Sequence, residues 1–313
     1  MYPLKLKPIY DKTIWANDHL TTIRGMEDKG YGTSWEISAH DYCSNVITNG
    51  EYAGQTLMDL IVSNEKEMLG NHSFSEMLRV AYLDAKEDLS IQVHPYNEYA
   101  LKYDNDMGKI ESWYVLDAKP GAVLAAGCLS TDKEIIRDAI EKGNLEQYVN
   151  KVAIEPGDFI MIDAGMLHAL GGGILALEVG TNSNTTYRFY DYNRRDEKGN
   201  LRELHIDKSF DVVDLGKKTH KISNPLKNVD HNECKILADC DAFVVELHDI
   251  AGELELDTKK ERFYILSFVH NDAAIEYQNE EYPVAYTENI FIPADCGKLT
   301  VKGHARVLVS YVK

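Results

Sequence analysis

The stretch PGDFIMIDAGMLHAL, residues 156–170, has the layout of a β-hairpin that ends at a histidine. A Pro-Gly-Asp turn opens it, large aliphatic residues follow, and a small-residue turn, Ala164-Gly165, precedes His168. A short apolar run bounded by turn residues is typical of a β-strand. The stretch therefore predicts two strands joined by a tight turn, with an imidazole placed at the end of the hairpin.

A second stretch, LSIQVHP at residues 89–95, places Gln92 and His94 two positions apart in a short strand. Alternate residues of a strand point to the same face, so this amide and this imidazole share one environment. Glu111 begins another predicted strand, ESWYVL. Together with His168 these side chains supply two imidazoles, one carboxylate and one amide oxygen, a set that suits zinc and also manganese, iron or cobalt.

Each of these residues taken singly has an ordinary structural explanation. A lone histidine is usually a satisfied structural residue, Glu111 could be a solvated strand end, and His168 could cap a turn. Their combination with the hairpin carries the prediction. The hairpin resembles the second motif of the cupin barrel, and Gln-x-His followed by Glu resembles a variant of its first motif. The resemblance implies a β-barrel that holds one metal.

Most of the remaining chain reads as short strands between turn residues. We expect a mainly β protein with two cupin-type jelly-roll or β-barrel domains and a few inserted helices. Residues 1–220 would form the catalytic metal-binding cupin domain with the helical insertions, and 221–313 a degenerate cupin-like β domain without metal ligands. The boundary falls in the polar stretch 214–233. The segment 283–301 repeats the plan of 152–170 without its histidine.

Helical periodicity interrupts the strands in a few places. Four helices are predicted, at 56–69, 96–103, 131–142 and 206–213. In the third, Thr131 and Glu134 have the spacing of a capping box. Its predicted apolar stripe consists of Ile135, Ile136, Ala139 and Ile140.

A longer series of segments runs in order over roughly residues 3–215. It includes PIYDKTIW, SWEIS, LSIQVHP, GKIESWYVL, the hairpin and TTYRFYDYNR, and it resembles the type I mannose-6-phosphate isomerases in their short bacterial form. By this resemblance, the positions that match the zinc ligands of the family are Gln92, His94, Glu111 and His168. Arg188 in TTYR matches the essential active-site arginine, and Lys109 matches a lysine of the substrate pocket. The resemblance implies one Zn²⁺ per chain, with other divalent metals as alternatives.

The chain departs from the pattern of this family at five positions. They are Ala16, Thr33, Gly180, Thr181 and Asn184. The four ligand positions and Arg188 are intact, so the resemblance implies the chemistry of the family. The departures bear on substrate preference and on catalytic efficiency.

The implied reaction interconverts mannose 6-phosphate and fructose 6-phosphate through a cis-enediol(ate). A metal would polarise the carbonyl, and Arg188 would add positive charge where the oxyanion develops. Lys109 would either stabilise the same charge or shuttle protons. Two alternatives remain open: an iron-dependent cupin dioxygenase, and a non-enzymatic sugar-binding cupin with a structural metal. The dioxygenase leaves the TTYR segment and Lys109 without a role.

The composition excludes several partners. The formal net charge is −18 and the pI is about 5, which argues against nucleic acid and anionic membrane surfaces. A phosphosugar would need a locally basic pocket. The five cysteines are scattered without a CxxC pair, and no apolar run reaches the length of a membrane span. We expect a cytoplasmic protein that is a monomer or a weak homo-oligomer.

Overall fold

The structure, a computed structural model, describes residues 1–195, 198–219 and 221–313. The chain forms two compact units, which are described separately. The C-terminal unit comprises Met1–Ile9, Trp35–Val80 and Leu226–Lys313. The central unit comprises Tyr10–Ser34 and Ala81–Pro225.

The predicted division into domains 1–220 and 221–313 stays a prediction, and the compact units have other bounds. The N-terminal segment groups with the C-terminal one because strand β1 (Leu4–Lys7) pairs with β20 (Asn289–Ile292). The chain leaves the central unit at Pro225, inside the polar stretch 214–233.

Most of the central unit belongs to two sheets, one of seven strands and one of five. The strands of the seven-stranded sheet are, in spatial order, β14 (Lys221–Ser223), β10 (Asp158–Ile162), β7 (Glu111–Ala118), β12 (Ile174–Thr181), β5 (Leu78–Ala85), β3 (Tyr31–Ile37) and β2 (Ile9–Lys12). Those of the five-stranded sheet are β13 (Tyr187–Tyr190), β6 (Ile91–Val93), β11 (His168–Ala169), β8 (Val123–Cys128) and β9 (Val149–Ala153). One core cluster takes Trp113 and Val115 from β7 together with Leu124 and Ala126 from β8, so the two sheets pack against each other.

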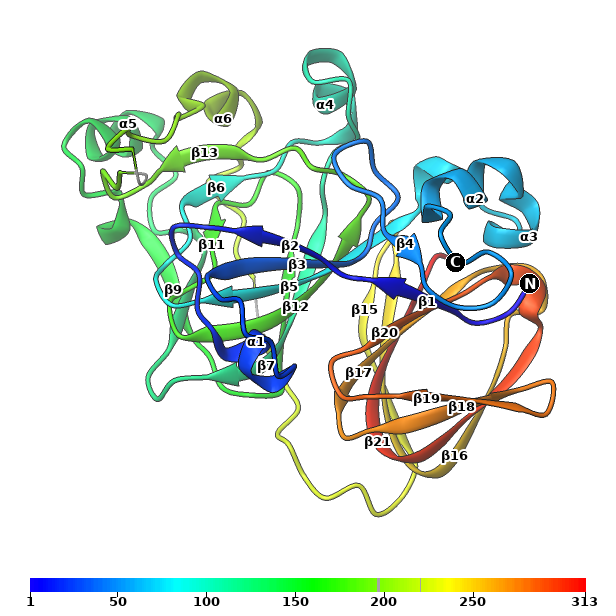
Figure 1. Cartoon of the computed structure of the whole chain (residues 1–313). Helices are drawn as coiled ribbons and strands as arrows, with labels where there is room; N and C mark the ends of the chain where they lie inside the picture. The colour runs from blue at the N-terminus through cyan, green and yellow to red at the C-terminus, as the bar shows by residue number, and fades with distance from the viewer. Residues whose placement is uncertain (196–197, 220) are drawn as a thin grey trace. The chain divides into compact units, whose positions relative to one another are not determined.

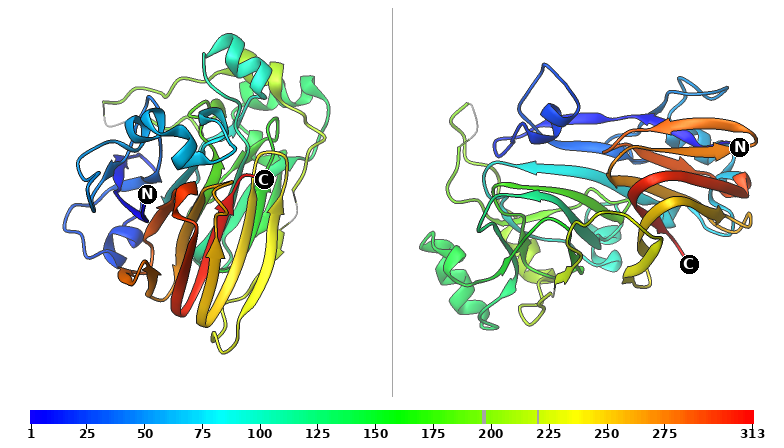
Figure 2. Two further views of the ribbon diagram at one scale, coloured as in Figure 1. Left: turned by 90° about the vertical axis from the view of Figure 1, so that its right-hand side faces the viewer. Right: turned by 90° about the horizontal axis from the view of Figure 1, so that it is seen from below.

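The C-terminal unit contains a nine-stranded sheet. Its main path is β15 (Glu233–Asp239), β16 (Val244–Asp257), β21 (Lys298–Tyr311), β17 (Tyr264–His270), β20, β1 and β4 (Val46–Ile47), while β18 (Ala273–Tyr277) pairs with β21 and β19 (Glu280–Val284) pairs with β18. The strands β16 and β21 run side by side for 14 residues each (Figure 2). The prediction of a mainly β chain is confirmed in both units.

Helices occur at all four predicted positions, and α1 is an additional helix that the sequence analysis did not predict. They are α1 (His19–Ile23), α2 (Leu57–Ser63), α3 (Glu65–Leu69), α4 (Asn97–Tyr103), α5 (Lys133–Glu141) and α6 (Ile206–Val212), with 3-10 turns η1 (Phe74–Glu76), η2 (Leu145–Gln147) and η3 (Ala294–Cys296). The helix predicted at 56–69 is two helices, because the backbone of Asn64 leaves the helical conformation (φ −142°, ψ 44°). No described helix is both long enough and apolar enough to cross a membrane.

The predicted capping box of α5 is wrong. The capping residue is Asp132, whose carboxylate accepts a hydrogen bond of 2.9 Å from the Glu134 backbone N–H, so the helix begins two residues after Thr131. Ile136 and Ala139 of the predicted stripe are buried, whereas Ile135 is 41% exposed. The apolar face is therefore narrower than its sequence indicates.

Candidate active site

The hairpin has the predicted form, and its two glycines explain why. Gly157 (φ +90°) and Gly165 (φ +79°) both adopt the left-handed conformation that glycine favours. The backbone N–H of Gly165 donates a hydrogen bond of 2.8 Å to the carbonyl of His94. This turn ties the hairpin to the LSIQVHP stretch and brings β11 alongside β6.

Three of the predicted site residues form one row across the five-stranded sheet. Strand β6 lies between β11 and β13 (Figure 1), and Gln92 is directly opposite His168 on one side and Arg188 on the other. Residues directly opposite each other share a face of the sheet. His94 follows β6 immediately, two positions after Gln92, and continues this face.

The opposing seven-stranded sheet supplies the carboxylate. Glu111 opens β7, and its two oxygens lie 3.3 Å from His94 Nε2 and 3.4 Å from His168 Nε2. All three side chains are at least 99% buried, and their ligand atoms lie within 4.8 Å of one another. Usual zinc–nitrogen and zinc–oxygen bond lengths place neighbouring tetrahedral ligands about 3.4 Å apart. The observed separations fit a metal ion of this size.

Backbone carbonyls orient both imidazoles through their Nδ1 atoms. His94 Nδ1 lies 3.0 Å from the carbonyl of Thr185, and His168 Nδ1 lies 2.8 Å from that of Met166. A carbonyl only accepts, so each Nδ1 carries the proton and each Nε2 presents a lone pair. Within the described part of the chain, His94 Nε2 and Glu111 Oε1 form no hydrogen bond. Buried lone pairs that face one another in this way fit a bound cation.

Gln92 completes the set of four candidate ligands. Its amide nitrogen lies 3.4 Å from His168 Nε2, and its oxygen accepts a hydrogen bond of 3.3 Å from the Ser90 hydroxyl. The two ends of an amide differ little in shape, so turning the amide over would direct its oxygen toward the other ligands. The structure therefore brings together all four residues that the sequence predicts.

Lys109 lies beside the ligands, in contact with a residue that sequence reasoning missed. Its Nζ is 2.6 Å from Glu111 Oε2 and 2.8 Å from Glu178 Oε1. The Lys109 and Glu178 side chains are 8% and 5% exposed. The one signal for Glu178 in the sequence is a carboxylate inside the otherwise apolar run ILALEVG of β12.

These contacts determine the charges of the site. Burial opposes the charge on Glu111, but Lys109 and His94 hold the pKa of that carboxyl well below its usual range. Burial also opposes the charge on Lys109, and the two glutamates outweigh it and raise the pKa of the ammonium. Burial and the charge of Glu111 raise the pKa of Glu178. Burial and His94 lower the pKa of His168 to about 3, which keeps this imidazole neutral.

Arg188 lies on the ligand face, and within the described residues its guanidinium forms no hydrogen bond or ion pair with the four candidate ligands. Its Nη1 donates a hydrogen bond of 2.8 Å to the carbonyl of Glu203. Burial and the nearby Arg202 lower the pKa of Arg188. Arg194 and Arg202 both bind the carboxylate of Asp191. Arg194 also lies 3.9 Å from Glu87, and the charge of Glu203 acts on Arg188, so acidic side chains accompany the three guanidiniums.

Two of the departures from the family pattern lie next to Lys109. Gly180 is directly opposite Glu111 in the β7–β12 pair, where a side chain would meet the Glu111 backbone. The hydroxyl of Thr181 accepts a hydrogen bond of 3.2 Å from the Ile110 N–H and donates one of 3.0 Å to the carbonyl of Gly108. These residues therefore hold the backbone on both sides of Lys109.

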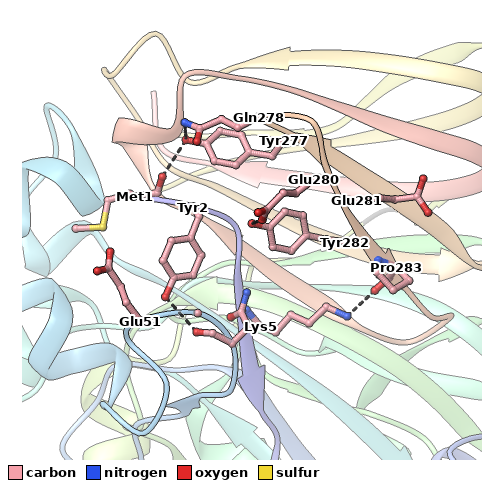
Figure 3. Close-up of a pocket in the computed structure, with 12 residues that line it drawn as sticks. Met1, Tyr2, Lys5, Glu51, Tyr277, Gln278, Glu280, Glu281, Tyr282 and Pro283 are labelled. Carbon is pink, nitrogen blue, oxygen red and sulfur yellow. Dashed lines mark hydrogen bonds between the residues drawn. The ribbon is translucent and has the colours of Figure 1, made fainter.

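A pocket of about 590 Å³ lies elsewhere, within the C-terminal unit (Figure 3). Tyr2, Lys5, Tyr277 and Tyr282 are among its lining residues, and the Lys5 ammonium donates to the carbonyl of Pro283. None of the six predicted site residues lines this pocket. The candidate active site thus belongs to the central unit alone.

The whole chain is similar to proteins of one known family. Residues 4–126 match the family model "Phosphomannose isomerase type I, catalytic domain", and residues 232–312 match "Mannose-6-phosphate isomerase, cupin domain". The chain is 33% identical to mannose-6-phosphate isomerase ManA of Bacillus subtilis, with 99% of each protein covered. It is 32% identical to the mannose-6-phosphate isomerase of Streptococcus mutans, with 99% of this chain and 98% of that protein covered. The crystal structure of a mannose 6-phosphate isomerase from Bacillus subtilis matches with a TM-score of 0.89 at 31% identity, with 100% of both chains covered.

Proposed function

The chain belongs to the type I mannose-6-phosphate isomerase family, with its cupin-type fold, and from this premise we propose that it interconverts mannose 6-phosphate and fructose 6-phosphate. The reaction moves a proton between C1 and C2 of the open-chain sugar and transfers the carbonyl in the opposite direction. Its cis-enediol(ate) intermediate carries negative charge on the sugar oxygens. The site must therefore supply positive charge and a proton carrier in a dry environment.

One observation carries the proposal beyond family membership. The buried Lys109 ammonium lies between Glu111, a candidate metal ligand, and Glu178, a second carboxylate without a place among the ligands. A site that only held a structural metal would not need this second ion pair. The dioxygenase alternative also leaves it without a role, and family membership supports the isomerase over both alternatives.

We propose that Gln92, His94, Glu111 and His168 hold one Zn²⁺, and the spacing of the two imidazoles and the carboxylate supports this. When bound, the metal supplies a Lewis acid that polarises the sugar carbonyl. The carbonyls of Thr185 and Met166 hold the two imidazoles in the tautomer that can bind it.

We propose Glu178 as the group that carries the proton between C2 and C1. Its side chain is 5% exposed, so water is largely excluded, and a carboxylate whose pKa is raised is a stronger base. The Lys109 ammonium, 2.8 Å from Glu178, would stabilise the negative charge that appears on the sugar oxygens as the proton leaves. Lys109 is thus the charge-stabilising residue rather than the base.

Arg188 would contribute positive charge on the opposing sheet, because it shares the face of Gln92 and His168. The neighbouring Arg194 and Arg202, which both pair with Asp191, are two further cations near which a sugar phosphate would bind. We further propose a cytoplasmic protein, which its five free cysteines support. A monomeric or weakly associated state also remains a proposal.

The experiment is a coupled assay of the purified full chain with mannose 6-phosphate, in which fructose 6-phosphate formation is read through reduction of a nicotinamide cofactor. Turnover should stop after chelation and return with zinc. Mannose without its phosphate is the control substrate and should react poorly. Absence of fructose 6-phosphate from zinc-loaded protein would overturn the proposed function.

A further inference from the structure

A second group of metal-ligating side chains lies in the C-terminal unit. Cys234 is on β15, and Glu246 and His248 are on β16. His248 Nε2 is 3.6 Å from Cys234 Sγ and 2.8 Å from Glu246 Oε2, and the three ligand atoms lie within 4.8 Å of one another. A thiol, an imidazole and a carboxylate are the three side-chain types that zinc prefers.

The strand register brings these three side chains to one face. Cys234 is directly opposite His248 in the β15–β16 ladder, and Glu246 is two positions from His248. On the other side of β16, Glu246 is opposite Val309 and His248 is opposite Val307. Both valines belong to the hydrophobic core of the unit. The β16 part of the cluster therefore borders the core, where an ionisable side chain is costly without a partner, while the β15 part reaches solvent.

Cys234 is open to solvent, and Tyr311 orients the carboxylate of Glu246. Strand β15 is the last strand of the sheet path, and Cys234 is exposed, whereas His248 is buried. The Tyr311 hydroxyl donates a hydrogen bond of 2.8 Å to Glu246 Oε1, which leaves Oε2 directed at His248. A hydrogen bond to the outer oxygen of a ligating carboxylate is a common device for orienting metal ligands.

We propose that Cys234, Glu246 and His248 form a second metal site, which takes Zn²⁺ or a similar borderline-soft divalent cation. The 3.6 Å between sulfur and nitrogen equals, to about 0.1 Å, the separation that usual zinc bond lengths give for tetrahedral neighbours. The metal replaces the Glu246–His248 hydrogen bond, so the proton of that bond leaves to solvent or moves to His248 Nδ1, which frees Nε2 and the carboxylate as ligands. The thiol proton of Cys234 also leaves to solvent, because the thiolate is the ligand. A thiolate and a carboxylate together neutralise the dication.

Three protein ligands leave a fourth position of the metal for water or for a small ligand. The site is independent of the proposed isomerase function, since none of its residues belongs to the central unit. It also departs from the prediction that residues 221–313 lack metal ligands. That prediction rested on the missing histidine of the 283–301 repeat, whereas these ligands come from β15 and β16.

The test uses Co²⁺ as the probe, added to full-length chain whose first site is filled with zinc. Only the second site contains sulfur, so a thiolate-to-cobalt charge-transfer band reports that site alone. One equivalent of Co²⁺ should bind and produce this band. Cys234→Ser should abolish both the binding and the band without changing isomerase turnover. Cys240→Ser is the matched control, because Cys240 is a thiol of the same unit outside the cluster, and this variant should keep the band. Tyr311→Phe should weaken Co²⁺ binding by about tenfold or more.

A second measurement needs no variant. Zinc should protect Cys234 of the native chain from alkylation, as read by peptide mass mapping, and should leave Cys240 reactive. The proposal is overturned if excess Co²⁺ gives no charge-transfer band, if the band survives Cys234→Ser, or if zinc leaves Cys234 as reactive as before.

Discussion

Lys109 shows how much of the chemistry rests on single side chains. Its ammonium contacts Glu111 at 2.6 Å and Glu178 at 2.8 Å, and all three groups are removed from water. Each carboxylate would be destabilised by burial without this cation. One lysine thus keeps a candidate metal ligand charged and holds a candidate proton carrier in place.

Glu178→Gln tests the proton carrier. The amide keeps the shape of the side chain but cannot accept the proton, so we expect the turnover number to fall by about 100-fold or more. Zinc content should remain at one catalytic equivalent, because Glu178 is outside the ligand set. The exposed Glu155→Gln is the control and should behave as the native chain. Near-native turnover of Glu178→Gln would restrict Glu178 to positioning Lys109.

Arg188→Ala tests the positive charge that Arg188 supplies from the five-stranded sheet. If the guanidinium stabilises the enediolate, the turnover number should fall by about 100-fold or more. The Michaelis constant should change less, because such a contact contributes little to ground-state binding. Arg188→Lys should recover only part of the rate, since an ammonium lacks the planar fork. A steep rise of the Michaelis constant with normal turnover at saturation would instead make Arg188 a phosphate clamp.

At the scale of elements, the second turn of the hairpin positions His168. A Cβ at Gly165 would lie 2.4 Å from the Tyr96 hydroxyl, at a φ of +79°. Gly165→Ala should lower the free energy of unfolding by about 3 kcal/mol through backbone strain and crowding, and should weaken zinc binding. Gly121→Ala is the control, because Gly121 has a similar φ of +76° and no described atom within 4 Å of its added Cβ. It should lose only about 1 kcal/mol. Urea unfolding measures both, and equal losses would contradict the crowding argument.

The end of β13 depends on a buried carboxylate. Burial opposes the charge on Asp191, but hydrogen bonds from Arg202 and Arg194 outweigh it and lower the pKa of this carboxyl. Asp191→Asn should therefore cost about 2 kcal/mol of unfolding free energy at neutral pH. Because the pKa of this carboxyl is lower in the folded chain, the ionised carboxylate stabilises the fold at pH values above its unfolded-state pKa of about 4. This stabilisation is lost as the pH falls through the folded-state pKa. The difference between native chain and variant should thus shrink below about pH 4.

The exposed ion pair of Asp138 with Lys142 supplies the control for that experiment. Asp138→Asn should change the unfolding free energy little at any pH, because solvent screens such pairs. A difference between native chain and Asp191→Asn that stayed constant from neutral to strongly acidic pH would contradict the assigned ion pairs.

At the scale of the whole molecule, we expect metal binding to stabilise the folded chain. A metal held only by the native state stabilises it by about 1.4 kcal/mol for each tenfold rise of free metal above the dissociation constant. The Cys234→Ser variant lacks the second proposed site. Its free energy of unfolding should rise by this amount for each tenfold rise of free zinc. The slope should vanish when His94→Ala is added. Calorimetry over a series of zinc buffers measures it, and a zinc-independent melting temperature would exclude tight binding at the first site.

The sequence by itself determined the β class of the chain through its local order, and it indicated the four candidate ligands through short motifs that resemble those of a known family. Alternation places Gln92 and His94 on one face, and the two glycines of the hairpin permit the turns that lead to His168. Local order also predicts most helices, although the choice between Thr131 and Asp132 as the cap of α5 depends on backbone geometry that spacing does not specify.

Only the tertiary structure decided which distant residues meet. Glu178 lies in an apolar run, and it contacts Lys109 because β12 pairs with β7. Residues 1–9 group with the C-terminal segment because β1 pairs with β20. No local sequence pattern predicts this pairing. The cluster of Cys234, Glu246 and His248 arises in the same way, from the register of β15 against β16. Strand register is a collective property of the sheet, since a shift of one residue would turn every side chain to the opposite face.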